Sequence, residues 1–309
     1  MKIIISEFME EAEVDRLRQS FDVTYDATLV DDSKKLQSLL ADADALIVRN
    51  RTQVTSELLQ HAPALKALGR LGVGLDNIDL TACEQRGVKV LPAVGANAQA
   101  VAEYVITAMM LLVRGGFMAS SAIGEGAWPR AALSNGGEIA GKVMGLVGFG
   151  GIGQLTAKLA QGLGMQVIAY DPAIDQTDTV WNSTNVEPRT LEALVSESDV
   201  ISLHVPLLPS TNNMFDAALI GQMKPSAVLI NTARGGIVNE AALANALKAK
   251  KIYGAALDVF VTEPLGNQSP LAGIPNLLLT PHIAGLTVES NQRVSKVTAD
   301  RVADCLLKQ

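Results

Sequence analysis

Three glycines in the middle of the chain have the spacing of a phosphate-binding turn. The apolar run 143–147 has the length of a buried strand, Gly148, Gly150 and Gly153 follow it, and a helical pattern begins at Gln154. In such a strand–turn–helix unit the first glycine permits a tight turn, the second lets the backbone approach a pyrophosphate, and the third allows the helix to pack closely on the strand. The N–H groups at the start of the helix, aided by the helix dipole, would hold the diphosphate. Gly151 and Ile152 lie at this helix start and are therefore further candidates for binding the diphosphate.

A carboxylate follows at the separation that such a turn requires. The second apolar run of this unit, 166–170, ends in Asp171, which lies about 20 residues beyond the first glycine. A carboxylate at this place accepts hydrogen bonds from a ribose diol and repels a 2′-phosphate. The next residues supply no arginine that could accommodate such a phosphate. The pattern therefore predicts a dinucleotide site that prefers NAD to NADP.

Polar side chains come after each of the later apolar runs. Ligands of open α/β sheets lie beyond the carboxyl ends of the strands, so these residues are candidates for one site at one rim. In chain order they are His204, Pro206, Thr232, Arg234, Asp258, Glu263 and His282. One arginine, one glutamate and one histidine thus converge where the nicotinamide of the dinucleotide should lie. No cysteine, Ser-His-Asp order or His-rich spacing suggests a nucleophile, and no metal site is expected.

The elements that must position these residues alternate between short apolar runs and amphipathic stretches. Such alternation predicts parallel βαβ units and hence an α/β fold. In the first third of the chain the candidate strands are 2–5, 23–25, 45–48, 66–68 and 88–91, and the candidate helices are 10–20, 34–41 and 56–62. In the second half the candidate strands are 143–147, 166–170, 200–203, 227–230, 254–257 and 277–279. These are enough strands for a complete dinucleotide-binding sheet.

A long apolar stretch connects the two α/β regions. It predicts a helix from Asn97, as its N-cap, to Arg114, and this helix should be deeply buried or lie at a subunit contact because it is apolar on most sides. The segment 115–141 is irregular and polar, and is interpreted as a connection or an arm. A final helix is predicted at about 288–307.

Composition narrows the class of protein. The chain has 309 residues, enough for two ordinary domains, and 48% of them are hydrophobic and 18% charged, as in globular proteins. A net charge of −7 gives no electrostatic support for binding nucleic acid. The longest uncharged apolar run, 105–113, is too short to cross a membrane, and the amino terminus lacks a signal-peptide pattern because Glu7 interrupts its apolar run. With only two cysteines, Cys83 and Cys305, far apart in sequence, a cytoplasmic location is expected.

Several ordered motifs resemble those of the D-isomer-specific 2-hydroxyacid dehydrogenases, and within that family the phosphoglycerate dehydrogenases most. They are the glycine turn and the stretches GRLGVGLDNID (69–79), NTARGGIV (231–238), ALDVFVTEP (256–264) and TPHIAG (280–285). The resemblance implies a Rossmann-type doubly wound parallel sheet, 98–282, inserted into a smaller flavodoxin-like α/β substrate domain, 1–97 and 283–309. It also implies a homodimer or a dimer of dimers, formed through the cofactor domains with 97–130 in the contact.

The resemblance also assigns roles, and the chemistry of the residues agrees with them. Arg234 would hold the substrate carboxylate and polarise the reacting C–O group through its planar fork of donors. His282 would take the hydroxyl proton as hydride leaves for NAD, and Glu263 would fix the tautomer of the imidazole and stabilise the imidazolium. Asp258 would orient the cofactor. The implied activity is the NAD-dependent oxidation of a small D-2-hydroxy acid to the 2-keto acid, or the reverse.

The substrate is left open by these motifs, but one arginine suggests its charge. Arg51 follows the run 45–48, and if it faces the substrate the pocket suits a second anionic group on C3, as in 3-phosphoglycerate or 3-sulfolactate. The alternative is that Arg51 only pairs with an exposed acid. The other candidates for binding the substrate are Gly72, Val73 and Gly74, through their backbone amides, and Asn97.

Three other activities fit parts of the same pattern. A glyoxylate or hydroxypyruvate reductase would use the same fold and the same residues. A dinucleotide-sensing regulator could keep Arg234, Glu263 and His282 without turnover. Formate dehydrogenase chemistry also uses this fold, but it abstracts no hydroxyl proton and therefore does not need the Glu–His pair.

Overall fold

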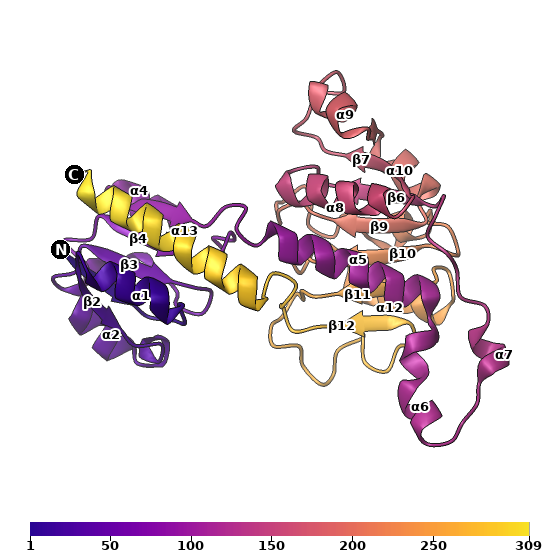
Figure 1. Cartoon of the computed structure of the whole chain (residues 1–309), viewed down its shortest axis with the longest axis horizontal. Helices are drawn as coiled ribbons and strands as arrows, with labels where there is room; N and C mark the ends of the chain where they lie inside the picture. Colours follow the sequence, from indigo (N-terminus) through magenta and orange to yellow (C-terminus); the bar gives the residue numbers. More distant parts are fainter. Residues whose placement is uncertain (309) are drawn as a thin grey trace. The chain divides into compact units, whose positions relative to one another are not determined.

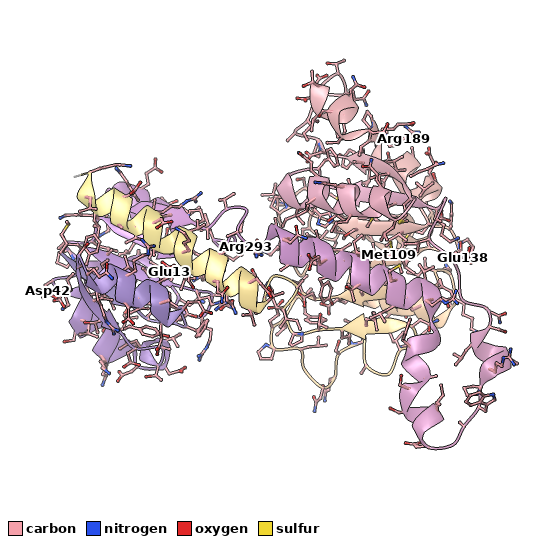
Figure 2. All side chains as sticks on the ribbon, in the orientation of Figure 1. Glu13, Asp42, Met109, Glu138, Arg189 and Arg293 are labelled. Carbon is pink, nitrogen blue, oxygen red and sulfur yellow. The ribbon has the colours of Figure 1, made fainter. Side chains whose placement is uncertain are left out.

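The computed structural model describes residues 1–308 and divides into two compact units (Figure 1). The smaller unit comprises Met1–Asn97 and the segment from Leu286 onward, and the larger unit is Ala98–Gly285. The smaller unit is thus discontinuous in sequence, with the larger unit inserted into it. Within the smaller unit, Arg293 near the start of the last helix (Figure 2) donates its Nε–H to the carbonyl of Ala96 at 3.0 Å and so ties the two segments together.

The boundary after the inserted unit differs slightly from the prediction. The larger unit ends at Gly285 and not at residue 282. The reason is that the backbone N–H groups of Ile283 and Ala284 both donate to the carboxylate of Asp258, at 2.8 Å each, and hold this stretch on the larger unit.

The smaller unit is built on a five-stranded parallel sheet with the strand order β2-β1-β3-β4-β5, which is the flavodoxin-like order. Its strands are β1 (Lys2–Ile5), β2 (Asp22–Tyr25), β3 (Ala45–Val48), β4 (Ala67–Arg70) and β5 (Lys89–Pro92). Its helices are α1 (Glu11–Arg18), α2 (Ser33–Leu40), α3 (Ser56–Gln60), α4 (Leu80–Gln85) and α13 (Val288–Leu307), with a 3-10 turn η1 (Leu29–Asp31).

Successive residues of each strand enter different cores, because side chains along a strand alternate between the two faces of a sheet. Ile4 packs with α2, α3 and α4, whereas Ile3 and Ile5 pack with α1 and α13. The contact with α13 is close: a Cβ on Gly69 of β4 would lie 2.7 Å from the side chain of Val302. Both faces of the sheet are therefore covered, as the continuous apolar strands require.

The larger unit contains a seven-stranded parallel sheet with the order β12-β11-β10-β9-β6-β7-β8. This is the doubly wound Rossmann order with one further strand at an edge. Its strands are β6 (Val143–Val147), β7 (Gln166–Tyr170), β8 (Glu187–Pro188), β9 (Val200–Leu203), β10 (Val228–Asn231), β11 (Gly254–Leu257) and β12 (Leu277–Leu279).

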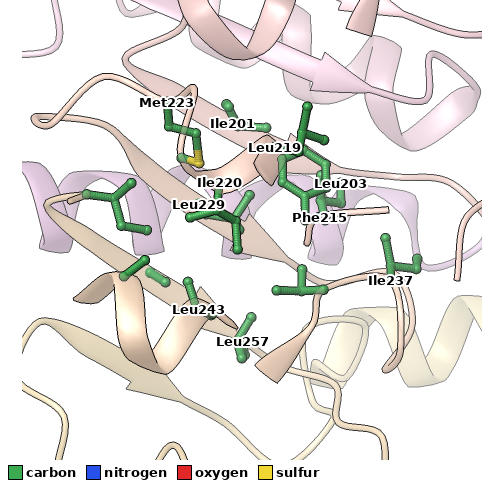
Figure 3. Close-up of a cluster of buried hydrophobic side chains, with 14 of the residues drawn as sticks. Ile201, Leu203, Phe215, Leu219, Ile220, Met223, Leu229, Ile237, Leu243 and Leu257 are labelled. Atoms are coloured by element: carbon green, nitrogen blue, oxygen red, sulfur yellow. The ribbon is translucent and has the colours of Figure 1, made fainter. Parts of the chain in front are cut away.

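Helices cover both faces of this sheet. One core is formed with α10 (Leu191–Glu197), α11 (Ala217–Ile220) and α12 (Glu240–Lys248) and is drawn in Figure 3. The other core is formed with α5 (Ala98–Arg114), α8 (Gly151–Gly162) and α9 (Thr179–Thr184). Between α5 and β6 the chain forms an arm with the short helices η2 (Gly116–Ala119), α6 (Ser120–Gly124) and α7 (Arg130–Leu133), which extends from the rest of this unit (Figure 1).

Candidate active site

The glycine turn has the geometry that its sequence predicts. Gly148 directly follows β6 with φ of +97°, and a Cβ there would lie 2.6 Å from the carbonyl oxygen of His204. A Cβ on Gly153 would lie 2.4 Å from the carbonyl oxygen of Gly148, so α8 can pack against the turn only because this residue is glycine. Beside Gly150 and Gly151 the space is open, with no atom within 4 Å of a built Cβ. The start of α8, where Ile152 also lies, is thus accessible to a diphosphate.

Asp171 is held against this turn. Its Oδ2 accepts a hydrogen bond from the N–H of Phe149 at 2.8 Å, and its Oδ1 accepts one from Ala173 at 2.9 Å. Phe149 is buried and stacks on Trp181 of α9, with 4.9 Å between ring centroids. A carboxylate can accept about four hydrogen bonds, so a fixed Asp171 keeps acceptor capacity for a ribose diol.

Replacing Asp171 by alanine should weaken the use of NAD and permit NADP. Loss of a charged hydrogen bond should lower kcat/KM for NAD by about 10–100-fold. The ratio of kcat/KM for NADP to kcat/KM for NAD should rise, because the repulsion between Asp171 and the 2′-phosphate is removed. The matched control is Asp175→Ala in the same loop, whose carboxylate bonds, within the described part of the chain, only to Thr177. Steady-state kinetics with both cofactors test this, and a wild-type protein that already prefers NADPH would contradict the role of Asp171.

Two orphaned polar atoms lie at the ends of the neighbouring strands β9 and β10. Among residues 1–308, the Nε2 of His204 and the Oγ1 of Thr232 are buried and have no hydrogen-bond partner. Burial lowers the pKa of His204 to about 4, so its ring is neutral at physiological pH. Buried polar groups are normally satisfied, and a bound cofactor would satisfy these two. Pro206 lies exposed on the same loop as His204, and its carbonyl accepts a hydrogen bond from the hydroxyl of Thr211 at 2.6 Å.

His282 and Glu263 form a hydrogen-bonded pair. The Nδ1 of His282 lies 2.8 Å from Oε2 of Glu263, and the other carboxylate oxygen accepts from the N–H of Phe260 at 3.0 Å. The carboxylate can only accept, so we assign the proton of the neutral ring to Nδ1, which leaves the lone pair on Nε2. The side chain of His282 is 46% exposed, and Nε2 can therefore accept a proton from a substrate.

Asp258 holds the loop that carries His282. This aspartate is 1% exposed. Its carboxylate accepts a hydrogen bond from the Thr280 hydroxyl at 2.6 Å and two more from the backbone amides of the two residues that follow His282. Its carbonyl accepts from the N–H of His282 at 2.8 Å, and Tyr104 of α5 bonds to the same threonine hydroxyl. This network helps to fix His282 in a left-handed backbone conformation, with φ of 57°. A contact of Asp258 with the cofactor remains a prediction.

Arg234 lies on a loop that packs on the Glu263 loop. The side chain of Asn231 shapes the loop: its Oδ1 accepts from Ala233 at 3.0 Å and its Nδ2 donates to the carbonyl of Arg234 at 2.9 Å. A Cβ on Gly235 would lie only 1.9 Å from the carbonyl oxygen of Phe260. Backbone thus meets backbone at this point, and the loops that carry the arginine and the Glu–His pair are brought together within the larger unit.

Apart from Arg234, the residues predicted to bind the substrate lie in the smaller unit, and two details of them differ from the prediction. The N–H of Gly72 donates to the carbonyl of Arg70 at 2.8 Å and is not available to a carboxylate, which leaves the amides of Val73 and Gly74. Asn97 does not cap α5, because its buried Oδ1 has no hydrogen-bond partner among the described residues.

Arg51 pairs with an exposed acid, which is the alternative to facing the substrate that the sequence left open. Its guanidinium bonds to the carboxylate of Asp31, and both side chains are exposed, at 59% and 62%. Exposed ion pairs contribute little to stability, so this pair can open when another anion arrives.

Two further residues that support the site, Glu7 and Tyr104, were not predicted from the sequence. Glu7 lies two residues beyond the end of β1, and its carboxylate fixes the loop that carries Arg49 and Arg51. Its position beyond the carboxyl end of a strand is the same signal that singled out the other candidates. Tyr104 gave no such signal, because it lies within an apolar helix.

Within the part of the chain that the structure describes, no three or more His, Cys, Asp or Glu side chains are grouped so that they could bind a metal ion. A doubly wound sheet with an accessible diphosphate turn, and with an arginine and a Glu–His pair beyond its later strands, belongs to a dinucleotide-dependent oxidoreductase.

Comparison with known proteins defines the family. The family model described as the NAD-binding domain of D-isomer-specific 2-hydroxyacid dehydrogenases matches residues 106–284. The chain is 50% identical, over 98% of both chains, to an (S)-sulfolactate dehydrogenase of Chromohalobacter salexigens. It is 40% identical to a hydroxypyruvate reductase of Thermotoga maritima, over 87% of this chain and 86% of that one. The chain therefore belongs to the D-isomer-specific 2-hydroxyacid dehydrogenases, and it is an NAD-dependent enzyme that acts on 2-hydroxy acids.

One relative is much longer than this chain, and one solved structure has a similar fold. The chain is 37% identical to a D-3-phosphoglycerate dehydrogenase of Synechocystis, covering 99% of this chain but only 54% of that protein. Its fold is similar to that of the NAD-bound, NAD-dependent formate dehydrogenase of Staphylococcus aureus, with a TM-score of 0.82, 30% identity and coverage of 98% and 95% of the two chains.

Proposed function

We propose that this enzyme oxidises a D-2-hydroxy acid with a second anionic group on C3, of which 3-sulfolactate is the first candidate, and that it also catalyses the reverse reduction. The observation that carries the proposal is the environment of Arg49. Its half-buried guanidinium donates to the neutral amide oxygen of Asn291 at 2.7 Å and lies over the ring of Phe8. Among residues 1–308 no carboxylate pairs with it. A partly desolvated guanidinium to which no carboxylate is bound favours binding an anion from outside the protein.

The relative named (S)-sulfolactate dehydrogenase supports this substrate class and its configuration. In lactate the carboxyl group outranks the methyl group, and the D isomer is designated (R). In sulfolactate the sulfur-bearing carbon outranks the carboxyl carbon, so the same spatial arrangement is designated (S). The (S) isomer in the name of this relative is therefore a D-2-hydroxy acid, as the family requires.

The larger unit would carry out the chemistry. Arg234 would pair with the C1 carboxylate and donate a hydrogen bond to the C2 oxygen, which stabilises charge that develops there. Nε2 of His282 would accept the hydroxyl proton as the C2 hydride departs, and Glu263 would keep Nδ1 protonated and stabilise the resulting imidazolium. When bound, NAD supplies the hydride acceptor. In the reverse direction the same imidazolium returns its proton to the C2 oxygen.

A comparison of kcat/KM across substrates tests the proposal. The wild-type protein should use (S)-sulfolactate or D-3-phosphoglycerate at least about 10-fold better than D-glycerate and D-lactate, the scale of one charged hydrogen bond. Preference for hydroxypyruvate or glyoxylate would favour the alternative activity, that of a glyoxylate or hydroxypyruvate reductase. The Thermotoga maritima relative carries the name hydroxypyruvate reductase. No turnover with any of these acids would favour a dinucleotide-sensing role.

We also propose that the chain forms a homodimer, or a dimer of dimers, through the arm of the larger unit. Trp128 is 79% exposed and Phe117 is 64% exposed, and Ile123, Trp128 and Leu133 line a shallow apolar hollow on this arm. Exposed apolar patches of this kind mark interaction surfaces. Trp128→Ala should shift the mass in sedimentation equilibrium toward the monomer. Monomeric wild-type protein at micromolar concentration would contradict the proposal.

A cytoplasmic location is a further proposal, supported by the buried thiol of Cys83, which suits a reducing compartment. Within the described residues no helix combines the length and the apolar character that crossing a membrane requires. Detection of the protein in an extracytoplasmic fraction would contradict this proposal.

A further inference from the structure

One buried carboxylate in the smaller unit takes no part in the chemistry described above. Glu7 lies two residues beyond the end of β1, an interior strand of the sheet, and is 4% exposed. Buried acids are rare unless they are paired or fully hydrogen-bonded. The neighbouring strand β3 ends beside it, and the loop 49–52 begins there with Arg49.

Glu7 accepts hydrogen bonds from four consecutive backbone amides of this loop. Its Oε1 accepts from the N–H groups of Arg49 and Thr52 at 2.9 Å each, and its Oε2 accepts from Arg51 at 3.0 Å and Asn50 at 3.3 Å. Burial raises the pKa of Glu7, but the hydrogen bonds from Thr52, Arg49 and Arg51 outweigh it and hold the pKa below its ordinary value. The carboxylate is therefore ionised at neutral pH and fixes the conformation of the whole loop.

Neighbouring polar groups complete this support. The hydroxyl groups of Ser6 and Thr52 lie 2.9 Å apart, and Asn77 donates to the carbonyl of Thr52 at 2.7 Å. The oxygens of Glu7 are occupied by amides, so Glu7 balances the charge of Arg49 without binding its guanidinium. Burial lowers the pKa of Arg49, and the charges of Glu7 and Glu10 oppose that shift. The guanidinium thus stays charged and keeps donors for another anion.

We propose that Glu7 is a positioning residue for substrate recognition: it fixes the loop 49–52 so that Arg49 and Arg51 receive the second anionic group of the substrate. This inference rests on the proposed substrate class and adds to it the residue that organises the recognition loop. It predicts that Glu7 acts on discrimination between substrates and not on the chemical step, whose residues lie in the larger unit.

The test is Glu7→Gln, which keeps the shape of the side chain but removes its charge and places a donor against amides that are themselves donors. We expect kcat/KM for (S)-sulfolactate to fall by about 10–100-fold, and kcat/KM for D-lactate to change by less than about 3-fold. The affinity for NADH, measured by fluorescence titration, should not change. Glu7→Asp, which keeps the charge but shortens the reach, serves as the second variant if the glutamine variant folds poorly, and it should show the same selective loss.

The matched control is Asp44→Asn in the same unit. Asp44 precedes β3, at the opposite end of this strand from the loop, and accepts hydrogen bonds from the N–H of Lys2 and the amine of Lys66 at 2.8 Å each. This variant should lower the melting temperature and leave the ratio of the two kcat/KM values unchanged. A double-mutant cycle adds a readout that a purely structural role would not affect. If Glu7 acts through Arg49, Glu7→Gln should change discrimination little once Arg49→Gln is present.

The outcomes separate this inference from the proposed function. Suppose that the wild-type protein discriminates in favour of (S)-sulfolactate. If the Glu7 variants then discriminate equally well, or if their kcat/KM falls equally for both substrates, the inference is wrong and the proposed function stands. If the wild-type protein itself does not discriminate, the proposed substrate class is wrong and this inference falls with it. Selective loss in the Glu7 variants, absent from Asp44→Asn, supports both.

Discussion

Replacing His282 by alanine should lower kcat by about 10²–10⁴-fold, the range for losing a positioned general acid or base. The reason is geometric: its Nδ1 is bound to Glu263 at 2.8 Å, and only Nε2 remains to accept the hydroxyl proton. The affinity for NADH should change little, because the diphosphate turn belongs to a different loop of the larger unit. Steady-state kinetics and a fluorescence titration with NADH measure the two quantities.

The chain has three histidines, and another of them provides the control for this substitution. His61 is exposed at the end of α3 in the smaller unit, and His61→Ala should retain wild-type turnover. Near wild-type kcat in His282→Ala would mean that another group moves the proton. In that case the Glu263–His282 pair would have to be explained as a structural contact.

The fold was largely predictable because its strands are buried on both faces. Continuous apolar runs such as 143–147 and 200–203 leave few other interpretations, and they coincide with β6 and β9. The two-residue edge strand β8 was missed because its paired residues, Glu187 and Pro188, carry no apolar pattern. Pairing with β7 through the backbone, and not hydrophobic periodicity, makes them a strand.

The site could be predicted where side-chain type determines the chemistry and could not where the backbone does. The positions of Arg234, Glu263 and His282 beyond successive strands followed from the sequence, and the structure places all three on loops of one unit. The engagement of the Gly72 amide depends on a local turn that no residue type specifies. The buried Glu7 was overlooked because its partners are amides, and every residue except proline has one.

Gly235 is a second example of a backbone constraint that the sequence does not reveal. Its φ lies outside the left-handed region, so conformational freedom does not explain why glycine is present. The explanation is space: a Cβ would lie 1.9 Å from the carbonyl oxygen of Phe260, 2.1 Å from its carbonyl carbon and 2.7 Å from the nitrogen of Val261. All three are backbone atoms of the loop that leads to Glu263, so no side-chain rotation can relieve the contact.

Gly235→Ala should therefore separate the Arg234 loop from the Glu263 loop by an amount on the order of 1 Å and lower kcat/KM by about 10²-fold, since catalysis is this sensitive to misplacement of that size. The free energy of unfolding should fall by only about 1–3 kcal/mol, the usual cost of overpacking, and the protein should remain folded. The matched control is Gly266→Ala in the same unit, where a built Cβ meets no atom within 4 Å. It should leave both kcat/KM and the melting temperature close to the wild-type values. Wild-type kcat/KM in Gly235→Ala would show that the two loops need not touch for Arg234 and the Glu263–His282 pair to act on the same substrate.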